Sequence, residues 1–507
     1  MKKLFLSKSA LCVYVPPRYL SSIGQNKSDL APLPYDRVPG PSKWTLPFMF
    51  FPGGKLHNVD LMGMHSILRV SYGDILVFKG YLGERDTVIT YNPEDFEKVY
   101  RTEGIWPERI GLMSFDHYRK KVRPDFFQGL GGLVSDQGKS WADFRGKVNP
   151  ILMKTETIRQ NIPKIEKIAT EFVQKLPNLL DTTGKPTVSF NQEVKKWSVE
   201  QIGVLALNKR LGLLDSTKEN KEALEFIKCM NDFFDISYEI EMRPPTWKYY
   251  ESSRFKRLMK VFDQITEFTT KHIEQALTNV DPKTEAVSIL EKLDKVDRKV
   301  AIIMANDMLM AGVDTTSSAF VTVLYHLAIN QEKQSKLREE CYKVSPDTFT
   351  ELNADKLRNL PYLRACIKEA LRITPITPGN FRMAGQDLVL SGYKIPKGTG
   401  VLMCVMAASN SEDFFPQAHD YLPERWLKSR DDACPHMKAN NPFVYLPFGF
   451  GPRTCIGKRI AEMEIECLII KLLRNYKVSW ESNKPIRYRS NLILVPDENL
   501  YFKFVKI

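Results

Sequence analysis

Apolar residues along most of this chain recur every three or four positions, the spacing that places them on one face of an α-helix. The longest such stretch covers residues 298–330. Its apolar run from Val300 to Val313 is interrupted by Asn306 and Asp307, and a membrane-spanning helix needs about 20 apolar residues. We therefore expect a buried helix there. The predicted helices are 140–152, 160–178, 195–211, 254–280, 298–330, 331–343, 359–373 and 456–475.

Strand-like segments flank this helical part of the chain. Residues 75–91 hold two β-type runs around Gly80 and Gly83, which predicts paired strands, and further strands are expected near 387–404 and 492–505. Residues 413–454, rich in proline, asparagine and aromatics, predict a long loop. The chain contains no internal repeat or clear linker. We therefore predict one large domain, mainly α with small β-sheets (α+β), although 507 residues at about 150 per domain would allow three.

Charge sets the N-terminus apart from the rest of the chain. The net charge is +13, and residues 1–28 contain five basic residues, recurring serines and no acidic residue. This composition is typical of a mitochondrial transit peptide, whereas Pro16 and Pro17 shorten the apolar centre that a secretory signal needs. A disordered basic tail is the alternative. We predict a leader over residues 1–28 and a single domain over residues 29–507.

One of the eight cysteines stands in a distinctive loop. The cysteines form no C-x-x-C pair, which argues against a zinc site or a disulfide framework. Residues 448–457 match F-x-x-G-x-R-x-C-x-G, where glycines let the backbone approach a flat cofactor. Cys455 directly precedes an apolar helix, whose N-terminal dipole favours a thiolate and hence an iron ligand. Arg453 can pair with a carboxylate. Otherwise Cys455 would be one more buried thiol.

This segment resembles the haem-binding loop of cytochrome P-450 monooxygenases, and the likeness continues in motif order from about residue 36 to the end. It implies a single cytochrome P-450-like haem-thiolate domain in which Cys455 holds the iron of haem b. Trp141 and Arg145 share one helical face, and both are donors suited to a haem propionate. The residues implied to bind the cofactor are Cys455, Arg453, Trp141, Arg145, Arg382, Phe448, Gly449 and Gly457.

The segment A-G-V-D-T-T, which begins at Ala311, lies inside the long apolar helix. The Thr315 hydroxyl can bond to the Ala311 carbonyl and open the helix locally. Asp314 adds a carboxylate, and an acid beside an alcohol can relay the protons that dioxygen cleavage consumes. The resemblance implies that Thr315 and Asp314 are the catalytic residues of an oxygen-activation helix. A buried polar kink without a chemical role is the alternative.

The E-x-x-R motif at Glu369 is weak by itself, because Glu251 matches it too. Only Glu369 is followed by a P-E-R-W segment and then by the cysteine loop. The resemblance therefore implies a structural triad of Glu369, Arg372 and Arg425, which positions that loop.

The electrons must come from another protein, because no flavin or dinucleotide fingerprint accompanies the cysteine loop. Basic residues near the cysteine resemble the mitochondrial branch of the family, which docks an acidic [2Fe-2S] ferredoxin that a ferredoxin reductase supplies with electrons. The docking candidates are Arg364, Lys368, Lys458 and Arg459. Part of the positive charge is thereby assigned to a protein partner, and no nucleic-acid partner is expected.

The whole pattern most resembles insect mitochondrial members, which include ecdysteroid hydroxylases and xenobiotic-oxidising enzymes. We favour O2-dependent oxidation of a lipophilic xenobiotic, with an ecdysteroid or sterol substrate as the alternative. The expected location is the matrix side of the inner mitochondrial membrane, in peripheral contact with it. The segment 243–250 is either a surface loop or a membrane-touching lid. The substrate-pocket candidates are Phe126, Phe127, Met308, Ala311, Ile376 and Thr377.

Three other functions compete with this interpretation. Residues 132–140 nearly match a P-loop, which would indicate an NTPase, but the spacing is one residue too long. A peroxide-rearranging haem-thiolate isomerase or lyase would not need the acid and alcohol at Asp314 and Thr315. A non-catalytic haem sensor would not need a substrate cavity.

Overall fold

A computed structural model describes residues 31–81, 83–215, 220–243, 245–278, 288–347, 350–427 and 441–507. The predicted leader, residues 1–28, lies outside the described residues, as does part of the predicted loop 413–454. In the described parts of that loop, the helical elements are short 3-10 turns at Pro423–Trp426 and Pro442–Val444.

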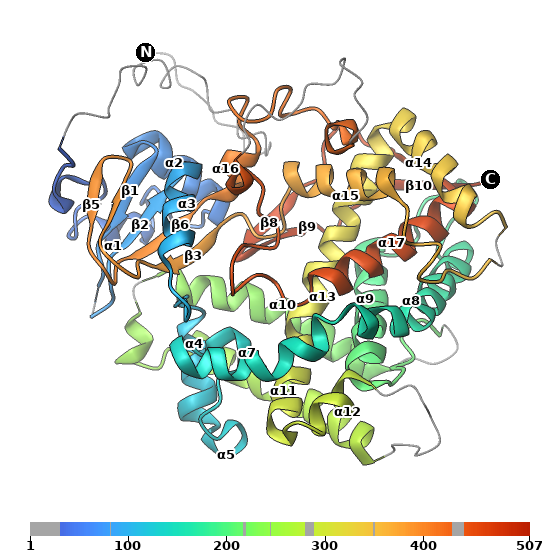
Figure 1. Ribbon diagram of the computed structural model, residues 1–507, viewed down its shortest axis with the longest axis horizontal. Helices are drawn as coiled ribbons and strands as arrows, with labels where there is room; N and C mark the ends of the chain where they lie inside the picture. The colour runs from blue at the N-terminus through green and yellow to red at the C-terminus, as the bar shows by residue number, and fades with distance from the viewer. Residues whose placement is uncertain are drawn as a thin grey trace.

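Helix α13 (Arg298–Ile329) runs through the middle of the molecule (Figure 1). Its N-terminus is capped by Asp297, whose side chain accepts hydrogen bonds from two backbone N–H groups. Apolar residues surround α13 on all sides, as expected of a helix buried by its neighbours. It packs against α9 (Phe190–Leu207), α11 (Ser253–Thr278), α12 (Ile289–Asp294), α15 (Pro361–Ile373) and α17 (Lys458–Asn475).

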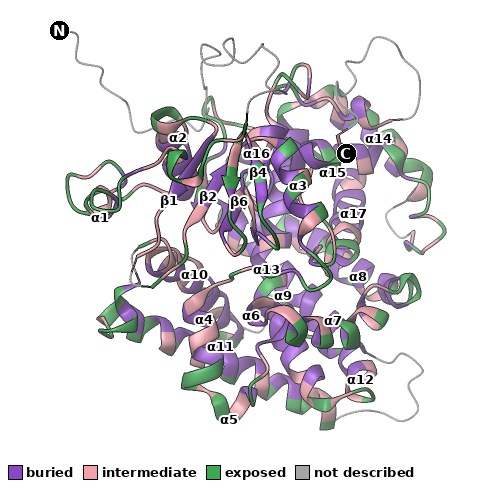
Figure 2. Cartoon of the chain, turned by 60° about the vertical axis from the view of Figure 1, so that its left-hand side comes forward, coloured by how far each residue is buried: buried purple, intermediate pink, exposed green. Residues whose placement is uncertain are grey.

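The remaining helices complete this mainly α part of the molecule. The longer ones are α2 (Leu61–Tyr72), α3 (Pro93–Thr102), α7 (Gly138–Leu152), α8 (Thr155–Lys175), α10 (Lys221–Glu241) and α14 (Gln331–Val344). The shorter ones are α1 (Leu46–Phe50), α4 (Met113–His117), α5 (Pro124–Phe127), α6 (Gly132–Ser135) and α16 (Val405–Ser409). A π-helical turn at Tyr118–Val122 follows α4. Buried residues concentrate on the inner sides of these helices (Figure 2).

A four-stranded sheet lies beside the helices, in the order β1 (Ile75–Phe78), β2 (Thr87–Thr90), β6 (Gly400–Met403) and β3 (Asn380–Met383). Strand β2 pairs antiparallel with β1 and parallel with β6, which pairs antiparallel with β3. Three two-stranded sheets pair β4 (Leu388–Leu390) with β5 (Tyr393–Ile395), β7 (Tyr476–Trp480) with β10 (Phe502–Lys506), and β8 (Tyr488–Asn491) with β9 (Ile493–Pro496).

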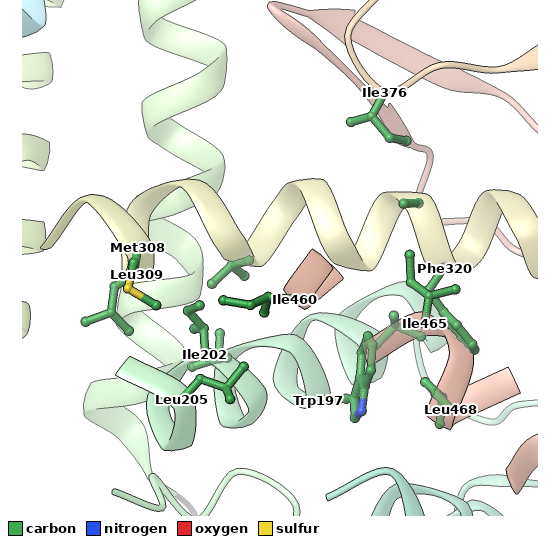
Figure 3. Close-up of a cluster of buried hydrophobic side chains, with 14 of the residues drawn as sticks. Trp197, Ile202, Leu205, Met308, Leu309, Phe320, Ile376, Ile460, Ile465 and Leu468 are labelled. Carbon is green, nitrogen blue, oxygen red and sulfur yellow. The ribbon is translucent and has the colours of Figure 1, made fainter. Parts of the chain in front are cut away.

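The largest hydrophobic core joins α9, α13 and α17. Trp197 of α9, Phe320 of α13 and Leu468 of α17 are fully buried there (Figure 3). The predicted fold class, mainly α with small sheets, is confirmed. Helices α2, α3 and α10 were not predicted, and α9 begins before residue 195 because Ser189 caps it by accepting a hydrogen bond from the Gln192 N–H.

Candidate active site

The cysteine loop is held in a tight, glycine-dependent conformation before α17. The Cys455 N–H donates to the Phe448 carbonyl at 2.9 Å, and the Thr454 N–H donates to the Gly451 carbonyl at 3.0 Å. Gly449 and Gly451 have φ values of 71° and 73°, a left-handed conformation that glycine adopts without strain. A side chain at Gly451 would also overlap the Glu103 carboxylate. The loop therefore presents Cys455 at a defined place, three residues before the start of α17.

Cys455 is the exposed member of the six cysteines that the structure describes. Burial nevertheless raises the pKa of its thiol, against the lowering effects of the Gly457 N–H and Arg145. The Gly457 N–H lowers the pKa of the thiol, as expected at a helix N-terminus, but burial outweighs this effect while no metal is bound. A coordinated metal ion would deprotonate the thiol.

The other described cysteines are buried in packed surroundings. Cys404 belongs to a separate cluster, where its Sγ lies 3.4 Å from Nδ1 of His65. Burial raises the pKa of the Cys404 thiol well above its usual range. Its environment is therefore that of a packed structural thiol.

Four arginines gather near Cys455: the predicted Arg145, Arg382 and Arg453, together with Arg109, which sequence analysis missed. Burial, followed by the nearby Arg109 and Arg382, lowers the pKa of Arg453 to about 9. Burial and Arg382 lower the pKa of Arg109 to about 10. These shifts show that the cluster carries poorly compensated positive charge. Arg109 stands in a segment without helical or strand periodicity, so no pattern pointed to it.

The arginine cluster has unused donors. Arg382 Nε lies 2.5 Å from the Glu103 carboxylate, and Arg145 Nη2 donates to the Thr454 carbonyl at 3.0 Å. Arg453 stacks on the Trp141 ring at 4.2 Å, but its Nη1 atom is buried without a partner among the described residues, and so is Nε of Arg145. Buried guanidinium donors need acceptors. Two carboxylates of an anionic cofactor, such as the propionates of haem, fit this requirement.

The oxygen-side segment of α13 has the predicted hydrogen bond. Thr315 Oγ1 donates to the Ala311 carbonyl at 2.6 Å. Ala311 is exposed although it lies midway along a helix that is buried on nearly all sides. Among the other pocket candidates, Met308 lies on the same helix and is buried.

Asp314 points away from Thr315, since consecutive helix residues do not share a face. Its Oδ1 atom lies 2.6 Å from Nζ of Lys195 on α9, and both side chains are nearly inaccessible to solvent. Lys195 also donates to Asn231 Oδ1 on α10. Sequence analysis missed Lys195, because its partner is on another helix and only its burial distinguishes it from a surface lysine.

The structural triad is assembled as expected. Glu369 accepts two hydrogen bonds from Arg372 and one from Arg425, each at 2.9 Å, and all three side chains are buried. The E-x-x-R motif at Glu251 behaves differently, because its Arg254 pairs with Glu239 at 2.9 Å.

The four docking candidates differ in exposure and in whether their charge is already paired within the protein. Arg364 pairs with Glu466 at 3.0 Å and donates to two backbone carbonyls, which ties its charge to the protein. Lys368, Lys458 and Arg459 are exposed. Arg459 donates to Thr155 Oγ1 at 3.1 Å, and Lys458 lies over the Phe448 ring. The surface beside the cysteine loop is thus basic.

Several candidates for the substrate pocket and the lid are more buried than residues that contact a substrate or a membrane need to be. Phe127 is fully buried against Tyr118, at a ring distance of 6.0 Å, whereas its neighbour Phe126 is half-buried. Ile376 is buried, and Thr377 is partly exposed. In the segment 243–250, Trp247 is buried in a stack on Phe255 with ring centroids 4.8 Å apart.

The P-loop-like segment packs against α13 and binds it. The Leu133 N–H donates to Asp307 Oδ2 at 2.9 Å, and a side chain at Gly132 would clash with the same carboxylate. Lys139 pairs with Asp143 at 2.6 Å. A phosphate cradle needs free N–H groups, so the NTPase interpretation is wrong for this segment.

Comparison with known proteins identifies the class. The sequence model of the Cytochrome P450 family matches residues 39–504, so the chain belongs to that family. Relatives include "Cytochrome P450 12b1, mitochondrial" of Drosophila acanthoptera, 50% identical over 91% of this chain and 88% of its own length. "Probable cytochrome P450 12b2, mitochondrial" of Drosophila melanogaster is 50% identical over 92% and 89%, and "Cytochrome P450 CYP12A2" of Musca domestica is 41% identical over 94% and 91%.

These findings confirm the predicted enzyme class and cofactor. The chain is an oxidoreductase of the cytochrome P450 monooxygenase type, which binds haem through a cysteine thiolate. The names of the relatives agree with the predicted mitochondrial location. Within the described residues, no helix has the length and apolar character that crossing a bilayer requires.

Proposed function

We propose that this monooxygenase binds haem b through Cys455, receives electrons from an acidic [2Fe-2S] ferredoxin, and oxidises a lipophilic xenobiotic. The observation that carries the proposal is the position of Cys455, whose side chain is accessible and lies beside a cluster of four arginines. This arrangement offers one thiolate for the iron and several donors for the propionates.

Haem, when bound, would supply the iron that binds O2, and the Cys455 thiolate would donate electron density that favours O–O cleavage. Trp141, Arg145, Arg382 and Arg453 would hold its propionates. The Thr315 hydroxyl, which donates to the Ala311 carbonyl, and the Asp314 carboxylate would supply the protons that O2 cleavage consumes. This acid and alcohol favour a monooxygenase over an isomerase or lyase, which consumes no protons in this way.

Cys455→Ser tests the ligand assignment. Without the thiolate, the reduced carbon-monoxide complex is expected to lose its red-shifted absorption band. Cys404→Ser is the matched control and is expected to keep the band, because Cys404 lies in a separate cluster. A variant Cys455→Ser that kept the thiolate band would refute the assignment.

The ferredoxin proposal is supported by the exposed basic side chains beside the cysteine loop. Lys368→Glu combined with Lys458→Glu is expected to slow haem reduction at limiting ferredoxin, because charge reversal lowers the association rate. Lys260→Glu, an exposed lysine on α11, is the control. If the double variant and the Lys260→Glu control had equal rates of haem reduction over a range of salt concentrations, ferredoxin docking on this surface would be contradicted.

The xenobiotic preference rests on whole-chain likeness, and the apolar candidates Phe126, Met308 and Ile376 support a lipophilic substrate. Difference spectra with a panel of small lipophilic compounds and steroids separate the two substrate classes. A spin-state change with small lipophilic compounds is the expected result. A response confined to steroids would favour the ecdysteroid or sterol hydroxylase.

Peripheral membrane contact is supported by exposed aromatic residues. Trp44, Phe48 and Phe51 lie in or next to α1, and Tyr249 and Tyr250 are exposed in the lid segment. Such residues suit a membrane interface. Phe48→Ser with Phe51→Ser is expected to reduce cosedimentation with vesicles of phosphatidylcholine and cardiolipin, whereas Val188→Ser is expected to leave it unchanged.

A further inference from the structure

Glu103 is a buried acid that stands among the arginines near Cys455, and sequence analysis missed it. It follows the last residue of α3 and is 8% exposed. Its Oε2 atom accepts a hydrogen bond from Nε of Arg382 at 2.5 Å. A buried carboxylate needs a paired cation, because burial disfavours its charge. Arg382 supplies that cation, so the two side chains form one buried unit.

The other oxygen of Glu103 lies against the cysteine loop. A side chain added at Gly451 would overlap Oε1, so glycine at this position leaves room for the carboxylate. Oε1 is buried and has no hydrogen-bond partner among the described residues. Burial raises the pKa of Glu103, and the nearby Arg382 and Arg453 oppose this rise. The negative charge of Glu103 is therefore incompletely compensated, beside the loop that carries Cys455.

Arg382 is held by contacts at all three of its side-chain nitrogens. Nε donates to Glu103, Nη1 donates to the Phe381 carbonyl at 2.9 Å, and Nη2 donates to the Phe450 carbonyl at 3.1 Å. The guanidinium also lies over the Tyr100 ring, 5.1 Å from its centroid. A guanidinium has five N–H donors. One N–H therefore remains on each terminal nitrogen of Arg382, and these are available to a haem propionate.

We propose that Glu103 is a positioning residue that fixes Arg382 against the cysteine loop, and that its negative charge lowers the reduction potential of the bound haem. Reduction of the haem iron adds one electron from the donor. A carboxylate buried nearby opposes this added negative charge, because the protein interior screens charges poorly. Glu103 thus sets how readily an electron donor reduces the haem. The inference rests on the proposed function only for Cys455 as the iron ligand.

Glu103→Gln tests the charge, because glutamine keeps the size of the side chain and an acceptor oxygen but is neutral. Redox titration of the haem-loaded protein is expected to give a higher midpoint potential in Glu103→Gln than in the parent. Glu97→Gln is the matched control, because it removes a carboxylate from the surface of α3, where Glu97 pairs with Arg101 at 2.6 Å. It is expected to leave the midpoint potential unchanged, since solvent screens an exposed charge. A midpoint potential in Glu103→Gln that equals the parent's, or lies below it, would overturn the inference.

The positioning role is tested by comparing Glu103→Ala with Glu103→Gln. Both variants lack the charge, but glutamine retains an acceptor for Nε of Arg382. Transfer of haem to an excess of a haem-scavenging apoprotein is expected to be faster in Glu103→Ala than in Glu103→Gln, on the order of tenfold, the effect of one hydrogen bond to a charged group. With Arg382→Gln added to each variant, this difference is expected to disappear, because the two residues act through one contact. Equal release rates in the two single variants, or a difference that persists with Arg382→Gln, would refute the positioning role.

The outcomes separate this inference from the proposed function. If Cys455→Ser keeps the thiolate band, the ligand assignment fails, whatever the midpoint potential of Glu103→Gln. If Cys455→Ser loses the band while Glu103→Gln keeps both the band and the parent's midpoint potential, the ligand assignment stands and the inference is wrong.

Discussion

Replacing Glu369 with alanine removes the carboxylate that two buried arginines share. Glu369 accepts hydrogen bonds from Arg372, from Arg425 at 2.9 Å, from the Trp426 indole at 2.8 Å and from the Leu422 N–H at 3.1 Å. Its loss leaves two guanidinium groups buried without their counterion. Breaking one buried pair in this way costs about 3–5 kcal/mol, and Glu369 serves two. We therefore expect a loss near 5 kcal/mol, out of the roughly 5–15 kcal/mol that stabilises a domain.

The assay measures haem content per protein and the midpoint of urea unfolding. Glu369→Ala is expected to purify with little bound haem and with a lowered midpoint, because the segment that carries Arg425 leads into the cysteine loop. Glu251→Ala, in a different E-x-x-R motif, is the control and is expected to match the parent. Normal haem content and an unchanged midpoint in Glu369→Ala would refute the reasoning.

Three further predictions address the oxygen side, a buried acid and a buried ion pair. Thr315→Ala is expected to release more peroxide per electron pair at unchanged substrate affinity; unchanged peroxide would exclude a role in proton delivery. Burial raises the pKa of Glu464 to about 8 from 4.5. The unfolded chain therefore releases this proton at a lower pH than the folded protein, and the free energy of unfolding falls between these two pH values by about 1.4 kcal/mol per pH unit. Glu464→Gln should flatten the pH dependence of the urea midpoint between pH 6 and pH 8, and an unaltered slope would contradict the assignment. Arg119→Leu removes the counterion of the buried Asp307 carboxylate and is expected to lower the free energy of unfolding in urea by about 3–5 kcal/mol. The added substitution Asp307→Leu should restore most of this loss. Equal losses in the single and the double variant would show that the ion pair is not the source of the loss.

The helical fold was largely predictable because its helices are long and their apolar residues regularly spaced. Helix α10 escaped prediction although it supplies Asn231, and its boundaries depend on contacts with α11 and on the Asn220 cap. The triad was implied by the family resemblance and by the order of its motifs along the chain, but the five hydrogen bonds that Glu369 accepts were not predicted. The free surface charge expected at Arg364 is instead tied to Glu466, a contact between α15 and α17.

The amino-acid sequence by itself determined the chemistry of the centre. The glycine-rich loop, its cysteine and the Ala311–Thr315 spacing are local patterns, because a loop conformation and an i,i+4 hydrogen bond depend on neighbouring residues in the chain. Only the tertiary structure decided which charges act together. Arg109 joins the arginine cluster, and Lys195 reaches Asp314, through contacts between residues more than 100 positions apart. Burial then sets the electrostatics of these groups, and burial is a property of the packed fold.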